Sequence, residues 1–194
     1  MLNRFSRGLT PIGIDIGPTG IRAVQLRCAG TRPALAAAAE IERAEPGRPL
    51  GDAEAERLAE VLRRQGFSGN RCVIAAPQEQ LLTGVLDLPP RRSGAPVDVI
   101  AAAEMARTHK CDPAGLEVGL WEIAPPAGQK FTGAPCMVVA ARAADLERPV
   151  ESLERAGLEV IAIDAPALAL QRSVTPAAPR AGAFVSVGMG SSLV

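Results

Sequence analysis

The apolar positions near the start of the chain follow a strand pattern. Isoleucine alternates with Gly13 and Asp15 over residues 12–16, and residues 21–26 form a second run rich in β-formers. The four residues between these runs, 17–20, are Gly-Pro-Thr-Gly, a composition suited to a tight reversal. The pattern therefore predicts a β-hairpin with a carboxylate just before its turn.

Strand and helix signals then alternate. Residues 34–42 are rich in alanine, which leaves a third strand and a short helix both open. Asp52 is expected to cap a helix that continues to about Gln65 and stops at Gly66. Residues 71–76 have the composition of a buried strand. This order of elements predicts an α/β layer arrangement.

The helix predicted from Asp52 is amphipathic. Its apolar face carries Ala55, Leu58, Val61 and Leu62. The charged positions around this face are expected to be solvated: Glu54, Glu56, Arg57, Glu60, Arg63 and Arg64. A helix with this pattern covers a sheet with its apolar stripe and leaves the other side in water.

The character of the chain changes after Pro77. The elements expected there are a strand over 81–88, a helix with Pro96 in its first turn, strands over 116–123 and 136–141, and a helix over 144–156. Pro149 lies inside the last helical pattern and predicts a late start or a kink. Together these elements predict a small α+β unit. A strand follows at 160–163, and Asp164 is expected to cap the next helix.

The strand–turn pattern of the first hairpin recurs at the end of the chain. A strand over 183–187 leads into a turn of glycine and hydroxyl residues, namely Gly188, Gly190, Ser191 and Ser192. Repetition of a strand–turn module suggests two related halves.

The charge balance and the aromatic content exclude several classes of partner. The 21 basic side chains equal the 21 acidic ones, which leaves no electrostatic footprint for nucleic acid or for an anionic membrane. Tyrosine is absent and there is one tryptophan, which argues against a stacking platform for single strands. The longest apolar runs are too short to span a bilayer, and Met1–Thr10 lacks the apolar segment of a signal peptide. The chain is expected to be cytoplasmic.

Cysteine and histidine do not form a recognisable metal site. The four cysteines are far apart, and His109 with Cys111 supplies only half of a zinc site. Cys28, Cys72 and Cys136 lie on or beside predicted strands, where reduced cysteine behaves as a small core residue.

The predicted turn has two interpretations. A carboxylate beside backbone N–H groups and a hydroxyl can hold a phosphate or its metal ion. An ordinary hairpin with a surface aspartate explains Asp15 equally well.

Several short runs, taken in order, resemble the actin-like ATPase superfamily of actin, Hsp70 and sugar kinases. Within it, the hairpin over 13–26 is similar to the first hairpin of the PilM family of type IV pilus assembly proteins and of its cell-division relative FtsA. The supporting runs are 71–77, 86–89, 101–105, 137–142, 156–164 and 183–194.

This resemblance implies an α/β fold of the actin-like, ribonuclease H-like type. The domains implied are a core subdomain over 10–80 and 159–178, an inserted α+β subdomain over 81–158, and the start of a second, truncated half over 181–194.

The resemblance also implies an ATP site between two halves. Its first turn would supply Asp15, Gly17, Thr19, Gly20 and Arg22, with Asp15 near Mg²⁺. Its second turn would supply Gly188, Gly190, Ser191 and Ser192. Pro18 removes one N–H donor from the first turn, and Ser186 stands where the family usually has an aspartate. The adenosine contacts implied by the resemblance belong to the second half, which these 194 residues do not include, so ATP binding by them alone is expected to be weak or absent.

The function implied is that of a non-enzymatic scaffold in type IV pilus or secretion-system assembly. It would hold the N-terminal cytoplasmic tail of a PilN-like single-span inner-membrane protein in a groove between core and insert, and so be peripheral to the inner membrane. Self-association is a further expectation, and nucleic acid is not an expected partner. The alternatives are an FtsA-like filament protein and a small-molecule kinase, for which Asp87 and Asp98 are no clear catalytic candidates.

Overall fold

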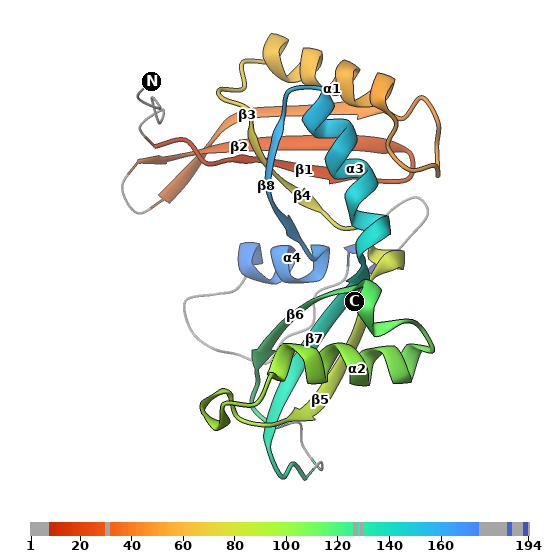
Figure 1. Ribbon diagram of the computed structural model, residues 1–194. Coiled ribbons are helices and arrows are strands. Elements are labelled where there is room, and N and C mark those ends of the chain that lie inside the picture. Colours follow the sequence, from red (N-terminus) through yellow and green to blue (C-terminus); the bar gives the residue numbers. More distant parts are fainter. Residues whose placement is uncertain are drawn as a thin grey trace. The chain divides into compact units, whose positions relative to one another are not determined.

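The computed structural model describes residues 8–29, 32–125, 128, 130–174, 186–187 and 192–193. The chain divides into two compact units. We call Met1–Gln78 with Arg148–Val194 the core unit, and Glu79–Glu147 the inserted unit. Each is built on its own sheet (Figure 1).

The core unit contains a five-stranded sheet in the order β3-β2-β1-β4-β8. Its strands are β1 (Ile12–Ile16), β2 (Gly20–Ala29), β3 (Arg32–Glu42), β4 (Arg71–Ala75) and β8 (Glu159–Asp164). The first three form an antiparallel meander, whereas β4 pairs in parallel with both β1 and β8. A mixed sheet of this kind requires crossover connections that place helices on its faces.

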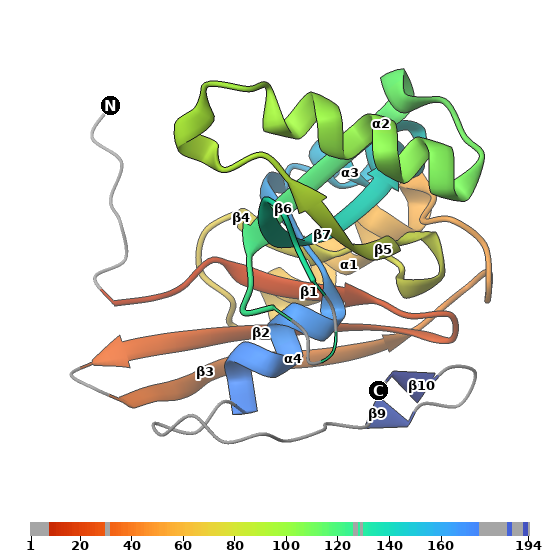
Figure 2. The same cartoon turned by 90° about the horizontal axis from the view of Figure 1, so that it is seen from below.

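Those helices are α1 (Asp52–Arg64), α3 (Ala143–Arg155) and α4 (Pro166–Val174). Seen from below, α4 lies in front of the sheet while α1 lies behind it (Figure 2). The hydrophobic core forms under α1, where Ile12, Ile14, Leu58 and Leu62 are almost completely buried. The alternating isoleucines of β1 therefore point toward α1.

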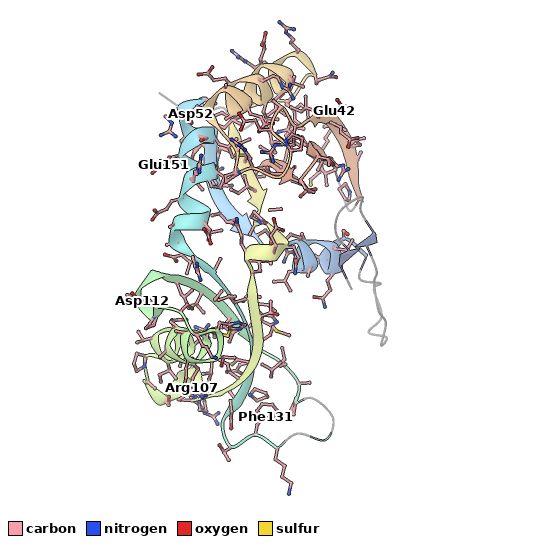
Figure 3. The ribbon with its side chains drawn as sticks, turned by 90° about the vertical axis from the view of Figure 1, so that its right-hand side faces the viewer. Glu42, Asp52, Arg107, Asp112, Phe131 and Glu151 are labelled. Carbon is pink, nitrogen blue, oxygen red and sulfur yellow. The ribbon has the colours of Figure 1, made fainter. Side chains whose placement is uncertain are left out.

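Polar side chains join α1 to the C-terminal part of α3. The hydroxyl of Ser152 donates to Asp52 Oδ1 at 2.8 Å, and Arg155 Nη2 lies 2.9 Å from the same oxygen. Arg155 also reaches Glu151 at 3.5 Å, and Figure 3 shows Asp52 and Glu151 side by side on the two helices.

The inserted unit contains a three-stranded antiparallel sheet in the order β5-β7-β6. Its elements are β5 (Leu82–Leu88), α2 (Val97–His109), β6 (Leu116–Glu122) and β7 (Ala134–Arg142), with short 3-10 turns at Gln78–Gln80, Arg91–Ser93 and Pro113–Gly115. The core under α2 contains Val97, Ala101 and Met105 packed on Cys136 and Val138. Pro96 occupies the N-cap position of α2, immediately before Val97, where its missing N–H removes no hydrogen bond within the helix.

Two short strands at the end of the chain, β9 (Ser186–Val187) and β10 (Ser192–Leu193), pair in antiparallel fashion. The turn predicted between them falls on Gly188, Gly190 and Ser191, which lie outside the described residues, as does the side chain of Ser192.

The α/β prediction is confirmed, and the alanine-rich stretch is strand β3. Asp52 is not the N-cap of α1: Gly51 holds that position and Asp52 is the first helical residue, and the Asp52 carboxylate bonds to Ser152 and Arg155 of α3. Asp164 likewise ends β8, and α4 begins at Pro166. Pro149 predicted a late start or a kink in α3. The late start is wrong, since the helix begins at Ala143 with Pro149 in its interior, and the kink stays a prediction.

The boundary between the units lies inside α3, earlier than the predicted residue 158. The reason is packing: Val150, Leu153 and Leu158 belong to the hydrophobic core of the core unit. None of the helices in the described part of the chain is long and apolar enough to span a lipid bilayer.

Candidate functional site

The first predicted hairpin is present between β1 and β2. Asp15 pairs with Arg22 across the two strands, and the N–H of Gly17 donates to the carbonyl of Gly20 at 2.9 Å to close the turn. A Cβ atom on Gly17 would approach the Gly20 oxygen to 3.1 Å, tighter than most Cβ contacts. Glycine at position 17 therefore serves the close approach of backbone to backbone.

The charged residues of this hairpin form an exposed cluster. Arg22 Nε lies 3.0 Å from Glu40 Oε1 on β3, and Arg22 Nη1 lies 3.7 Å from Asp15 Oδ2. All three side chains are more than half exposed. One guanidinium is thus shared between two carboxylates in full contact with water, where each ion pair contributes little to stability.

Three carbonyls of the turn bond to the segment that follows β3. The Gly17 oxygen accepts from Arg43 Nη1 at 3.1 Å, the Pro18 oxygen from the N–H of Gly47 at 2.8 Å, and the Thr19 oxygen from the N–H of Arg43 at 2.9 Å. The turn is therefore anchored through its acceptors, and its conformation depends on Arg43.

Arg43 is in turn held by Glu54, in the first turn of α1. Its Nε donates to Glu54 Oε2 at 2.9 Å, the other carboxylate oxygen accepts the Ala44 N–H at 2.8 Å, and both side chains are buried. The prediction that Glu54 is solvated is wrong. Acidic residues are common in the first turn of surface helices, so the local pattern does not distinguish this one.

The residues of the hairpin fit one side of a nucleotide in part. Asp15, Thr19 and Arg22 are exposed and offer a carboxylate for Mg²⁺, and a hydroxyl and a cation for phosphate. The N–H of Gly17 is already used within the turn, and Pro18 has none, so the turn holds fewer free donors than a phosphate loop requires. No group of three His, Cys, Asp or Glu side chains suited to a metal occurs among the described residues.

The inserted unit presents an apolar sheet face on the side away from α2. Cys136, Val138 and Ala140 of β7 point to the α2 core, so the alternating residues Met137 and Val139 point the other way. Two cross-strand rows result: Val85–Met137–Trp121 and Thr83–Val139–Gly119. We call these six residues the open face.

An antiparallel sheet with one face toward water normally carries polar residues there. The open face has only the hydroxyl of Thr83 and the indole of Trp121, and Val85 is 37% exposed. Taken alone, the alternation along β6 predicts an ordinary half-buried strand with Glu117, Gly119 and Trp121 on its exposed side. The signal missed was that β5 and β7 place valine and methionine beside it.

Asp87 at the end of β5 is engaged within the inserted unit. It accepts the N–H and hydroxyl of Thr132 and the N–H of Gly133, all at 2.8–2.9 Å, in the loop that also contains Phe131 (Figure 3). The Thr132 N–H, with the other two donors, lowers the pKa of this carboxyl below its ordinary value. Asp87 is thus a structural acceptor rather than a poised base.

The four cysteines are all reduced. Cys72 and Cys136 are buried as predicted, whereas Cys28 is exposed, which corrects its placement in the core. Cys28 is exposed because it lies near the end of the β2–β3 ribbon, beyond the register shift after Gln25.

No protein-family model matches the sequence, and no curated protein matches it. Among solved structures, a chain of the "PilM-PilN type IV pilus biogenesis complex" matches with a TM-score of 0.64 and 22% identity, over 84% of this chain and 49% of that one. The cytoplasmic domain of EpsL, an inner membrane component of the type II secretion system of Vibrio cholerae, matches with a TM-score of 0.54 and 12% identity, over 81% of this chain and 58% of that one.

The chain thus spans about half the length of the structures it matches. The likeness confirms the predicted actin-like α/β fold. At these identities it concerns the fold alone.

Proposed function

We propose that this chain is an assembly scaffold of a type IV pilus or a related secretion machine. In this role it binds the N-terminal cytoplasmic tail of a PilN-like single-span inner-membrane protein, which keeps it in the cytoplasm at the inner membrane. The support is the fold shared with a chain from a PilM–PilN complex and with the cytoplasmic domain of an inner-membrane secretion component.

The observation that carries the proposal is the open face of the inserted unit. An extended tail presents alternate side chains to a surface, and the Val85–Met137–Trp121 row offers an apolar strip for them. Short cytoplasmic segments beside a membrane span are rich in Lys and Arg. The exposed carboxylate of Glu117, which lies on the same side of β6 as Trp121, complements such a tail.

The proposal is tested by fluorescence anisotropy with a labelled peptide of the tail encoded beside this chain's gene. Val85→Glu places a charge on the open face and should weaken binding at least about tenfold, since a buried unpaired charge costs more than 1.4 kcal/mol. Val99→Glu is the matched control, because Val99 is 67% exposed on α2, away from that face. Equal binding by wild type and both variants, with circular dichroism unchanged, would contradict the proposed tail site.

We further propose that Mg²⁺-ATP binds in a longer protein that completes the second half. Thr19 and Arg22 would contact phosphate there and Asp15 the metal, opposite Gly188, Gly190, Ser191 and Ser192. Bound nucleotide would supply the negative charge that draws the two turns together. Hydrolysis is not part of this proposal, and neither is a kinase activity, because Asp87 is engaged by the loop at Thr132.

A further inference from the structure

We propose that β6 forms a two-fold symmetric, antiparallel strand pair with β6 of a second copy of this chain. In the part of the chain that the structure describes, β6 lies at the edge of its sheet and pairs with β7 alone. An edge strand exposes a row of backbone donors and acceptors that another strand can pair with. This inference is independent of the proposed tail binding.

The direction of the backbone groups of β6 follows from two hydrogen bonds. The N–H of Ile123, the residue after β6, donates to the carbonyl of Pro135 in β7, so the backbone groups of alternate residues back to Glu117 also face β7. The carbonyl of Leu120 instead accepts from Arg91 Nη2 at 3.4 Å, away from β7. The outward-facing groups therefore belong to Leu116, Val118, Leu120 and Glu122.

These outward groups are self-complementary about Gly119. With a two-fold axis at Gly119, Val118 of one copy lies opposite Leu120 of the other, and each exchanges two backbone hydrogen bonds with its partner. The side chains of both residues pack on the α2 side of the sheet, so the two apolar cores become continuous. The pairing extends one sheet into the other and leaves the open face uncovered.

The side chains of β6 also permit this register. Glu117 would lie opposite Trp121 of the second copy, and Glu122 opposite Leu116, so no two like charges face each other. Lys, Pro and bulges are usual features that protect a sheet edge from pairing, and β6 itself has no Lys, no Pro and no register shift against β7. The edge strand β3 of the core unit, by contrast, carries Pro33 and a register shift. The sheet edge at β6 is therefore matched to itself, and Arg91, which donates to the outward carbonyl of Leu120, moves aside when the strands pair.

A charge placed on the axis tests the register directly. Gly119 would face its own copy as a non-hydrogen-bonded pair, at a Cα–Cα distance of about 4.5 Å. A Cβ atom on Gly119 would lie 4.0 Å from the Val139 oxygen, an ordinary contact, so the inserted unit accommodates a side chain there. The test variants are Gly119→Lys and Gly119→Glu, with Gly119→Thr as a neutral control.

Sedimentation equilibrium of the 194-residue chain, up to about 1 mM, is expected to show dimers for wild type and for Gly119→Thr. Gly119→Lys and Gly119→Glu should each associate about fivefold more weakly, and their equimolar mixture should recover the wild-type constant, because the mixed pair has opposite charges on the axis. A monomeric wild type, charged variants that associate normally, or a mixture that stays weak would each overturn the proposal.

Hydrogen exchange followed by NMR provides a readout that does not depend on substitutions. The amides of Glu117, Gly119 and Trp121 should exchange slowly at every concentration, because they face β7. Those of Val118, Leu120 and Glu122 should become slow only as the concentration rises. Concentration-independent exchange at these three positions would also overturn the proposal.

Discussion

Arg43 Nε lies 2.9 Å from Glu54 Oε2, and the two side chains are only 2% and 7% exposed. The same guanidinium donates to the carbonyls of Gly17 and Arg48. One buried ion pair therefore connects the end of β3, the start of α1 and the turn of the first hairpin. The geometry of the predicted phosphate turn is set by a pair that does not belong to it.

Glu54→Gln should destabilise the chain by about 3 kcal/mol or more, because it leaves the Arg43 charge buried without its partner. Urea denaturation measures the change. Glu60→Gln is the matched control: Glu60 contacts Arg64 on the surface of the same helix, and an exposed pair contributes at most about 1 kcal/mol. Equal losses for the two variants would show that the buried pair has no special role.

A second prediction concerns pH and the contact between α1 and α3. The hydroxyl of Ser152, followed by the guanidinium of Arg155, holds the pKa of Asp52 below its ordinary value of 3.8. A lowered folded-state pKa contributes stability that is present above the unfolded pKa and is lost as pH falls through the folded pKa. The free energy of unfolding should therefore differ between wild type and Asp52→Asn at pH 7, and the difference should shrink below about pH 4. A constant difference down to pH 2 would contradict this account.

The parts of the fold that follow from short-range pattern were predictable. The isoleucine alternation of β1 locates the first strand, and Gly66, at φ +83°, ends the first helical segment as expected. The ambiguity over 34–42 was resolved by pairing with β2, a tertiary contact that overrides the helix propensity of alanine.

Long-range contacts account for the rest. Glu54 is ten residues from Ala44 in sequence, and Ser152 is 100 residues from Asp52, so no local periodicity could place either contact. The open face also depends on contacts between distant parts of the sequence. It combines Val85, Met137 and Trp121 from three strands, and each strand by itself has the pattern of an ordinary half-buried strand.

The loop that follows Phe131 gives a third prediction. A Cβ atom on Gly133 would collide with the carbonyl oxygen of Leu88, a backbone atom that cannot move freely. Gly133→Ala should therefore cost about 1–3 kcal/mol and weaken the hydrogen bonds to Asp87. Gly115→Ala, which meets no atom within 4 Å, should be close to neutral in the same thermal denaturation experiment. A neutral Gly133→Ala would show that the loop is free to shift.

The cysteines give a fourth prediction. Burial, with the negative charges of Glu154 and Glu159, raises the pKa of the Cys72 thiol to about 11, whereas Cys28 is exposed. A thiol reagent at pH 8 should modify Cys28 rapidly and Cys72 only after unfolding, since the thiolate is the reactive form. Cys28→Ser should remove the fastest phase of the reaction with the thiol reagent.

Because the folded-state pKa of Cys72 is raised, the stability that its neutral thiol contributes should decline as pH rises from 9 toward 11.

The last prediction concerns ATP. The turn at Gly17 has one N–H used internally and a proline without an N–H, and its Arg22 is shared between two carboxylates. We therefore expect labelled ATP with Mg²⁺ to show no micromolar affinity for the 194-residue chain in an anisotropy titration. Glu40→Gln removes one competitor for Arg22 and should increase any residual binding, whereas Arg22→Gln should remove it. Micromolar binding by wild type that persists in Arg22→Gln would show that the nucleotide uses other residues.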